Sequence, residues 1–378
     1  MRAGLATALA ATGLALVLSG CGGGSDTANS GPDCTVPGPR PAVALLAEPA
    51  SQPTARAQIC ELATDFRNVV MEPAWDAAAK ALLAVNHDVG LWQRRTLLLA
   101  CTGCRSSGLD LAQVRDDHPQ WILHDSAGRE VHLVGHPDQV LLDFGDPDYQ
   151  ASWQEAVGQQ LGARGYIGVV VTDARNDLQL SSVPIDPRTG QPMTDDDRAR
   201  YLAEALALAR GALKTDGFSL VAENEPPTVI DEAQIGSTDA VIAQDGGGGF
   251  AGRRGGAWDE LFAYYQAAVA RHVGAWVTDA GAADTRRVFG LASYLLVSGP
   301  LSSYGPPDRA DDPLYAIDLG KPSEDAQRSG DAWVRTFANG AVAVVPGDAP
   351  ASVELPGHGT VDLPAGGAVI ATGDRLVK

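Results

Sequence analysis

Eight short apolar runs alternate with helical patterns through most of this 378-residue chain. The clearest run, 167–172, is almost continuously apolar and β-branched, which is typical of a strand buried on both faces of a parallel sheet. The others are 66–71, 96–101, 140–143, 218–222, 240–244, 287–290 and 301–304. This number of strands alternating with helices predicts an α/β fold, the (β/α)8 TIM barrel.

The segments between and after these runs complete the expected architecture. Stretches rich in Ala, Leu, Glu and Gln predict helices at 74–85, 149–163, 195–214 and 258–277. Residues 121–134 alternate around the turn from Asp125 to Gly128 and predict a hairpin insertion. Short runs after residue 322, two of them separated by Asn339-Gly340, predict a small C-terminal antiparallel β domain.

The N-terminus has the features of an export signal. Arg2 precedes an apolar stretch, 5–18, which ends in small residues before Cys21. This pattern resembles the bacterial lipoprotein signal and predicts lipidation of Cys21; an ordinary secretory signal with an incidental Cys21 is the alternative. We therefore expect an exported protein of the cell envelope that contacts the membrane through its N-terminal lipid only. The expected domains are a signal (1–21), a flexible tether (22–58), a barrel (59–322) and a β domain (323–378).

Export places the remaining cysteines in an oxidising compartment, where four cysteines allow three pairings. Cys101 and Cys104 have the spacing of a redox or half-zinc motif, but no second such pair accompanies them, so a local disulfide is preferred. Cys34 and Cys60 would then join the end of the tether to the first folded element.

Charge and histidine spacing limit the possible partners. A net charge of −19 and a pI near 4.6 argue against binding nucleic acid or an anionic lipid surface and favour neutral or cationic ligands. His132, His136 and Asp138 could hold a metal, but their segment is predicted to be loop and hairpin. We therefore expect no metal and no cofactor.

Acidic and amide side chains follow four successive predicted strands, and the carboxyl ends of barrel strands are where ligands bind. They are Asp143 after the third strand, Asp173 after the fourth, Glu223 and Asn224 after the fifth, and Gln244 and Asp245 after the sixth. One cleft lined by carboxylates suits acid and base catalysis on a glycosidic bond, whereas the alternative is that these residues only form turns. Trp121, Trp258 and Tyr304 would either stack on sugar rings or pack in the core.

Several short motifs also resemble, in order, those of a glycoside-hydrolase-like barrel family related to endo-α-1,4-polygalactosaminidase. The motifs lie at 118–128, 142–150 with Trp153, 165–173, 222–224 and 335–340. The resemblance implies a TIM barrel, and the more distant α-galactosidase-like relatives use a carboxylate after strand four as nucleophile and one after strand six as acid/base. Asp173 matches the first position. At the second, Gln244 stands where a Glu is expected, so either Asp245 does its work through a bulge or the site has lost activity.

These observations favour an exported, lipid-anchored glycoside hydrolase that cleaves an extracellular or cell-envelope polysaccharide by paired-carboxylate chemistry, with Asp173 and Asp245 as the catalytic pair. The expected substrate contacts are Asp143, Glu223, Asn224, Gln244 and the three aromatic residues. The alternative function is a catalytically inactive carbohydrate-binding lipoprotein on the same barrel.

Overall fold

The computed structural model describes residues 34, 43–103, 106–175, 178–224, 232–243, 249–279, 286–306, 312–373 and 375–378, without the side chains of Asn224, Glu232 and Gln234. The predicted signal with Cys21, most of the tether, Cys104, Gln244 and Asp245 lie outside the described residues. Cys34 forms a disulfide with Cys60, and Cys101 is also disulfide-bonded.

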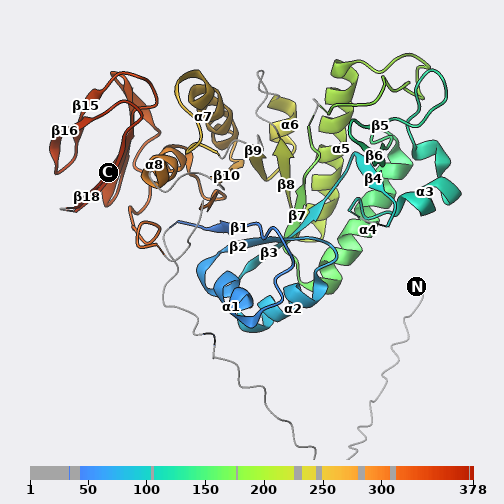
Figure 1. Ribbon diagram of the computed structural model, residues 1–378, viewed down its shortest axis with the longest axis horizontal. Coiled ribbons are helices and arrows are strands. Elements are labelled where there is room, and N and C mark those ends of the chain that lie inside the picture. Colours follow the sequence, from blue (N-terminus) through green and yellow to red (C-terminus); the bar gives the residue numbers. More distant parts are fainter. Residues whose placement is uncertain are drawn as a thin grey trace, which may run out of the picture. The chain divides into compact units, whose positions relative to one another are not determined.

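Eight parallel strands form the central sheet (Figure 1). In spatial order they are β1 (Leu46–Ala47), β2 (Asn68–Met71), β3 (Gly90–Arg95), β7 (Gly168–Val171), β8 (Ser219–Asn224), β9 (Ala240–Ala243), β10 (Gly274–Thr278) and β11 (Ser303–Gly305). A parallel bridge between Leu45 and Tyr304 joins the two edges, where the Tyr304 amide donates to the Ala44 carbonyl at 2.9 Å. The predicted barrel is therefore confirmed.

Side chains fill the barrel interior. Alternate residues of each strand point inward, and those that meet inside are Leu46, Val70, Trp92, Val170, Val221, Ala240, Ile242 and Trp276. The rings of Trp92 and Trp276 meet edge to face with centroids 4.8 Å apart, and the Trp92 indole donates to Asn68 Oδ1 at 2.9 Å. Because this core is packed, ligand chemistry is confined to the barrel ends.

Helices surround the strands. They are α1 (Arg56–Asp65), α2 (Asp76–Val85), α3 (Leu111–Asp117), α4 (Pro147–Arg164), α5 (Asp195–Thr215), α6 (Glu232–Gly236), α7 (Gly255–Ala270) and α8 (Arg287–Val297), with a 3-10 helix at Pro119–Trp121. Helix α4 begins where Asp146 accepts hydrogen bonds from the amides of Asp148 and Tyr149. Helix α5 begins with a capping box between Thr194 and Asp197. No described helix is long and apolar enough to cross a membrane.

Three predicted barrel strands are wrong. Residues 99–101 and 140–141 belong instead to a separate antiparallel sheet, β4 (Leu99–Cys101), β6 (His136–Leu141) and β5 (His132–Leu133), whereas 287–290 begins α8. All three runs are apolar because they are buried, which does not distinguish a strand from a buried helix. Strands β1, β3 and β10 were missed, and β10 had been merged into the predicted helix 258–277. The errors cancel in the count, so β7 is still the fourth strand and β9 the sixth.

The hairpin predicted around Asp125 is confirmed, because an antiparallel bridge joins His124 to Glu130. The C-terminal β structure is also confirmed. It has a five-stranded antiparallel sheet, ordered β12-β13-β14-β17-β18, and a separate hairpin, β15-β16. The strands are β12 (Gln327–Ser329), β13 (Ala332–Phe337), β14 (Gly340–Val344), β15 (Ala351–Leu355), β16 (Gly359–Leu363), β17 (Ala368–Thr372) and β18 (Arg375–Val377).

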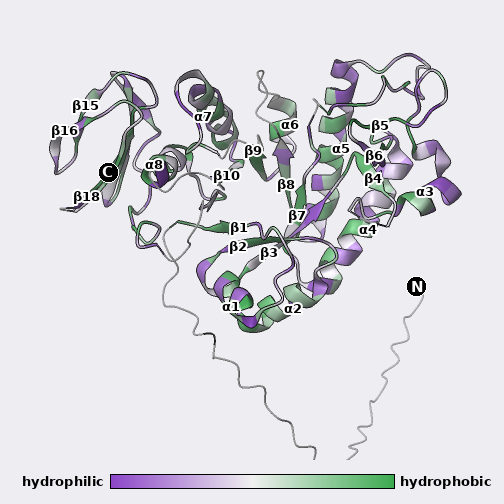
Figure 2. Ribbon diagram, in the orientation of Figure 1, coloured by the Kyte–Doolittle hydropathy of each residue, from purple (hydrophilic) through white to green (hydrophobic). Residues whose placement is uncertain are grey.

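The C-terminal sheet packs against α8. Arg335 strengthens this contact, since its guanidinium donates to the carbonyls of Leu295 and Ser298 at the end of α8, at 2.9 and 2.8 Å. Figure 2 shows hydrophobic colour along β1, β2 and β9, as expected for strands covered on both faces. Helix α8 is buried on nearly all sides between barrel and sheet, which explains its uniformly apolar sequence.

Candidate active site

Strand alternation determines which polar residues face the axis at the barrel mouth, the end where the parallel strands finish. On β3, Arg94 shares the inward side with Trp92, and on β8 Glu223 shares it with Val221. Glu48 and Glu72 follow the inward residues of β1 and β2 by two positions. One arginine and three glutamates from four strands therefore gather at the mouth.

Arg94 connects the first three strands through ion pairs. Its Nη2 lies 2.6 Å from Glu48 Oε2, and its Nε lies 3.5 Å from Glu72 Oε1. These side chains keep 30%, 23% and 37% of their surface exposed, so this part of the mouth is partly open to solvent, although burial raises the pKa of Glu48 against the effect of Arg94. Although burial opposes its charge, the carboxylates of Glu48, Glu223 and Glu72 raise the pKa of Arg94.

Glu223 is the most strongly perturbed acid of the mouth. It is only 2% exposed, and burial raises its pKa to about 8. The charges of Glu48, Asp173 and Glu72 contribute to this raised pKa, whereas Arg94 opposes them. Glu223 therefore holds a proton at neutral pH, as a general acid must.

Asp173 follows β7 on the side of Val169 and Val171, the residues that pack toward the helices. Its Oδ1 accepts from the Leu97 amide at 2.7 Å, and its Oδ2 accepts from the amides of the next two residues at 2.8 and 2.9 Å. Burial raises its pKa to about 6, although these amides favour the charged form. Asp173 thus anchors the loop after β3.

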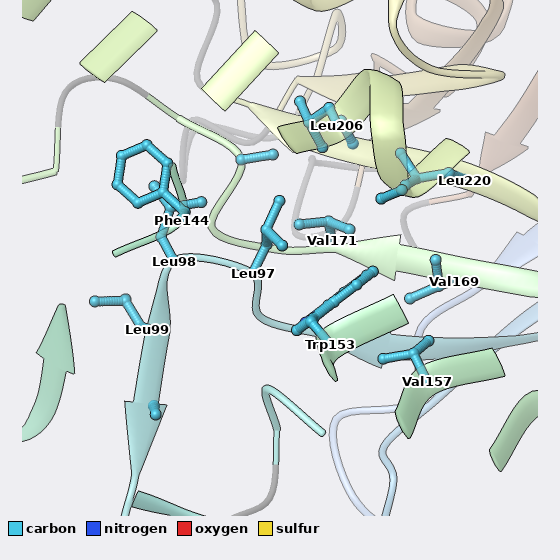
Figure 3. Packing of buried hydrophobic residues seen from close by; sticks show 14 of the residues in the cluster. Leu97, Leu98, Leu99, Phe144, Trp153, Val157, Val169, Val171, Leu206 and Leu220 are labelled. Atoms are coloured by element: carbon cyan, nitrogen blue, oxygen red, sulfur yellow. The ribbon is translucent and has the colours of Figure 1, made fainter. Parts of the chain in front are cut away.

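The leucines of the anchored loop add apolar contacts to these hydrogen bonds. Figure 3 shows Leu97 beside Val171 and Trp153, with Leu98 next to Phe144. The Trp153 indole also donates to the Thr96 carbonyl at 2.8 Å. The loop that carries the Asp173 contacts is therefore held from two sides, which fixes the carboxylate in one orientation.

Asp279 repeats this arrangement after β10. Its Oδ1 accepts from the Ala251 amide at 2.9 Å, and its Oδ2 accepts from the Tyr304 hydroxyl at 2.7 Å. It is fully buried, and burial raises its pKa to about 6. A Cβ at Gly290 would lie 2.1 Å from Asp279 Oδ2, so this helix position leaves no room for a side chain. Asp279 was not among the predicted site residues, because β10 was not predicted as a strand.

The three aromatic candidates are core residues. Trp121 stacks on His118 with ring centroids 3.9 Å apart, the Trp258 indole donates to Ser293 at 3.0 Å, and Tyr304 contacts Asp279. All three are buried. The expectation that they present faces to a sugar is therefore not met in this structure, and the packing alternative explains them.

Asp143 does not end a barrel strand, contrary to expectation. It follows β6 in the small antiparallel sheet, where its Oδ1 accepts from Arg188 Nη2 at 2.8 Å. Burial raises the pKa of Asp143, against the effect of Arg188. Arg188 also pairs with Asp186 at 3.0 Å, so it joins the segment after β6 to the turn at 186–188.

The structure does not describe the side chains of the remaining predicted residues at strand ends. Asn224 ends β8, but its side chain is not described, and Gln244 and Asp245 lie outside the described residues. The described part of the chain contains no group of three His, Cys, Asp or Glu side chains arranged to hold a metal ion.

The structure adds Glu48, Glu72 and Arg94 to the site. Glu72 directly follows the predicted strand 66–71, so its position was available from the sequence. Glu48 was hidden because its strand has only two residues and was assigned to the tether. Arg94 was hidden because the polar sequence of β3 does not resemble a buried strand.

The chain matches one family model and resembles several solved structures. The family model described as hypothetical glycosyl hydrolase family 15 matches residues 106–341. The α-galactosidase AgaA of Geobacillus stearothermophilus in complex with 1-deoxygalactonojirimycin has a TM-score of 0.54 at 12% identity, over 87% of this chain and 55% of its own. The chain thus spans about half the length of that enzyme. A maltogenic α-amylase, AmyB of Thermotoga neapolitana, has a TM-score of 0.51 at 10% identity, over 88% of this chain and 96% of its own.

A third solved structure is Ega3 of Aspergillus fumigatus in complex with galactosamine. It has a TM-score of 0.38 at 8% identity, over 63% of this chain and 77% of its own. No curated protein matches the chain. At these identities, the solved structures support the barrel fold alone.

Proposed function

The chain belongs to hypothetical glycosyl hydrolase family 15, and on that premise we propose that it is an exported, lipid-anchored glycoside hydrolase that cleaves an extracellular or cell-envelope polysaccharide. The family and the fold support a carbohydrate-active function. The reaction and the location are our inference from the residues at the barrel mouth and from the sequence before Cys21.

One observation carries the proposed chemistry. Asp173 follows β7, and Glu223 is the second-last residue of β8, the neighbouring strand. The pKa of Asp173 is raised to about 6 and that of Glu223 to about 8. At neutral pH, Asp173 is therefore mainly ionised and Glu223 mainly protonated. Glycoside hydrolysis by two carboxyl groups requires this pair of states, because one group protonates the leaving oxygen while the other attacks or activates water. We assign the nucleophile to Asp173.

Two residues compete for the role of the acid. The resemblance to α-galactosidase-like barrels implies an acid after the sixth strand, where Asp245 follows Gln244, whereas the raised pKa favours Glu223 on the fifth. Loss of the acid slows substrates with poor leaving groups far more than those with good ones. Comparing Glu223→Gln with Asp245→Asn on aryl glycosides of graded leaving-group acidity identifies the acid. Glu354→Gln, a change in β15 of the C-terminal hairpin, is the control.

The charge of the mouth limits the substrate. Three glutamates surround one arginine there, and the whole chain carries a net charge of −19. Such a site attracts cationic polymers, accepts neutral ones and repels polyanions. We therefore propose partly deacetylated amino-sugar polymers as substrates. Turnover of a polyuronate in preference to every amino-sugar polymer tested would contradict this substrate class.

Lipid anchoring has its own test. Cys21→Ser removes the proposed lipid acceptor and should move the protein from the membrane to the soluble exported fraction. Membrane association that persists in this variant would disprove the proposed anchor.

A specific observation favours the alternative function, a catalytically inactive carbohydrate-binding lipoprotein. Both oxygens of Asp173 accept backbone hydrogen bonds, and the residue is only 4% exposed. A wild-type protein that binds a glycan without turnover, through a site that tolerates Asp173→Asn, would support that alternative and exclude the hydrolase.

A further inference from the structure

Four charged groups act on Glu223, and three of them, Glu48, Glu72 and Arg94, share its inward direction at the barrel mouth. Glu48 follows β1, Glu72 follows β2, Arg94 lies on β3 and Asp173 follows β7. Three of these groups carry negative charge when ionised, and each of them favours the protonated form of Glu223. Arg94 acts in the opposite direction.

The charge of Arg94 is shared among the carboxylates. Its Nη2 is bound to Glu48 at 2.6 Å, its Nε lies near Glu72 at 3.5 Å, and the charge of Glu223 also acts on it. Arg94 interacts more strongly with Glu48 than with Glu72, because its contact with Glu48 is the shorter one. Whatever weakens the negative charge of Glu48 leaves more of the positive field of Arg94 to act on Glu223.

The next residue shows what a purely structural arginine looks like in the same strand. Arg95 points away from the axis, is fully buried, and donates to Gln93 and to Gln160 of α4. Arg94 instead lies at the open mouth and contacts carboxylates rather than neutral amides. The two arginines therefore have different roles on opposite faces of β3.

We propose that Arg94 is a positioning residue that holds Glu48 and Glu72 and, together with them, sets the proton affinity of Glu223. This deepens the proposed function and rests on the form of it in which Glu223, rather than Asp245, delivers the proton. Arg94 and Glu48 then form a tuning pair with opposite effects. Loss of Arg94 strengthens the hold of Glu223 on its proton, whereas loss of the Glu48 charge weakens it.

The proton of Glu223 can be followed without any substrate. Infrared difference titration of the purified chain records protonated carboxyl groups, and the band lost in Glu223→Gln identifies this residue. The band should disappear in wild type near the pKa of about 8. Arg94→Gln should move this midpoint upward, because it removes a positive charge that lowers the pKa of Glu223.

Three further variants complete the experiment. Glu48→Gln should move the midpoint downward, and Arg94→Lys, which restores the charge, should stay closer to wild type than Arg94→Gln. Arg115→Gln is the matched control, because Arg115 pairs with Glu130 at 2.6 Å on the surface of the insertion and should not shift the midpoint. A merely structural Arg94 would lower stability without these opposite shifts.

The outcomes separate the two proposals. Opposite shifts in Arg94→Gln and Glu48→Gln support the tuning pair even if no glycan is hydrolysed, in which case the hydrolase alone fails. In an active enzyme, the basic limb of the kcat/KM profile should move in the same directions. An unchanged midpoint in Arg94→Gln, shifts of equal sign in both variants, or no Glu223 band at neutral pH in wild type would overturn the inference.

Discussion

Replacing Asp173 by asparagine removes a buried charge to which three backbone amides donate. The single amide oxygen of asparagine can accept from Leu98 and Leu99, but its NH2 group then faces the N–H of Leu97. One charge-assisted hydrogen bond, with a net value of about 1.5 to 3 kcal/mol, is lost, and the other two weaken. The substitution therefore loosens the loop at residues 97–99.

An opposing effect comes from the charge itself. Burial raises the pKa of Asp173 from 3.8 to about 6, so the folded protein holds the proton more tightly than the unfolded chain does. This contribution to stability is fully present below the unfolded pKa and is lost as the pH rises through about 6. The full difference corresponds to about 3 kcal/mol at 1.36 kcal/mol per unit, and about 2 kcal/mol of it separates pH 7 from pH 4.5.

Asparagine does not titrate, so Asp173→Asn has no such pH dependence at this position. Near neutral pH, the loss of hydrogen bonds is partly offset by the removal of the buried charge. We expect the variant to be destabilised by less than about 2 kcal/mol near pH 7 and by about 2 kcal/mol more near pH 4.5. Denaturant unfolding of both proteins at the two pH values measures the difference. Hydrogen exchange at residues 97–99 should quicken in the variant. A destabilisation that is equal at both pH values, or larger near pH 7, would refute the reasoning.

Three further predictions concern other positions in the fold. The pKa of Glu223 is raised from 4.5 to about 8, so its contribution to stability is lost as the pH rises through about 8. The free energy of unfolding should therefore fall between about pH 6 and pH 9. Glu223→Gln should make this fall with pH less steep. Gly290→Ala should lower the free energy of unfolding by about 1 to 3 kcal/mol, because the new methyl group clashes with Asp279. Gly211→Ala, in open space on α5, should raise it by up to about 1 kcal/mol. Denaturant unfolding measures both changes. Replacing both Cys34 and Cys60 by serine should cost up to about 3.5 kcal/mol for a separation of 26 residues, and an unchanged unfolding midpoint would contradict that disulfide contribution.

The barrel could be predicted from the sequence because most of its strands are covered on both faces and are therefore apolar throughout. Strand β3 escaped notice for a physical reason, since its inward position at the mouth carries Arg94 and its outward face carries Gln93 and Arg95. The adjacent apolar run at 96–101 was chosen in its place. Strand β10 escaped because only a short turn at Arg271–Val273 separates it from α7.

The site was harder to predict than the fold, because a shift of one residue reverses the direction of a side chain. Asp173 was correctly placed after the fourth strand, but it lies on the side of Val171 and contacts backbone amides. Glu223 was assigned to substrate contact, and its pKa is raised by its burial and by carboxylates on three other elements. The closed barrel brings together side chains as far apart in sequence as Glu48 and Glu223, and patterns within single strands do not predict this.

The most direct test of the glycoside hydrolase is the pH dependence of kcat/KM on an amino-sugar or neutral glycan. Wild type should give a bell-shaped profile with limbs near the pKa values of Asp173 and Glu223, about 6 and about 8. Glu223→Gln should lose the basic limb and most activity on substrates with poor leaving groups, and Asp173→Asn should lose nearly all turnover. A wild-type protein that binds such glycans without turnover at any pH, or variants at both positions that keep full activity, would contradict the account.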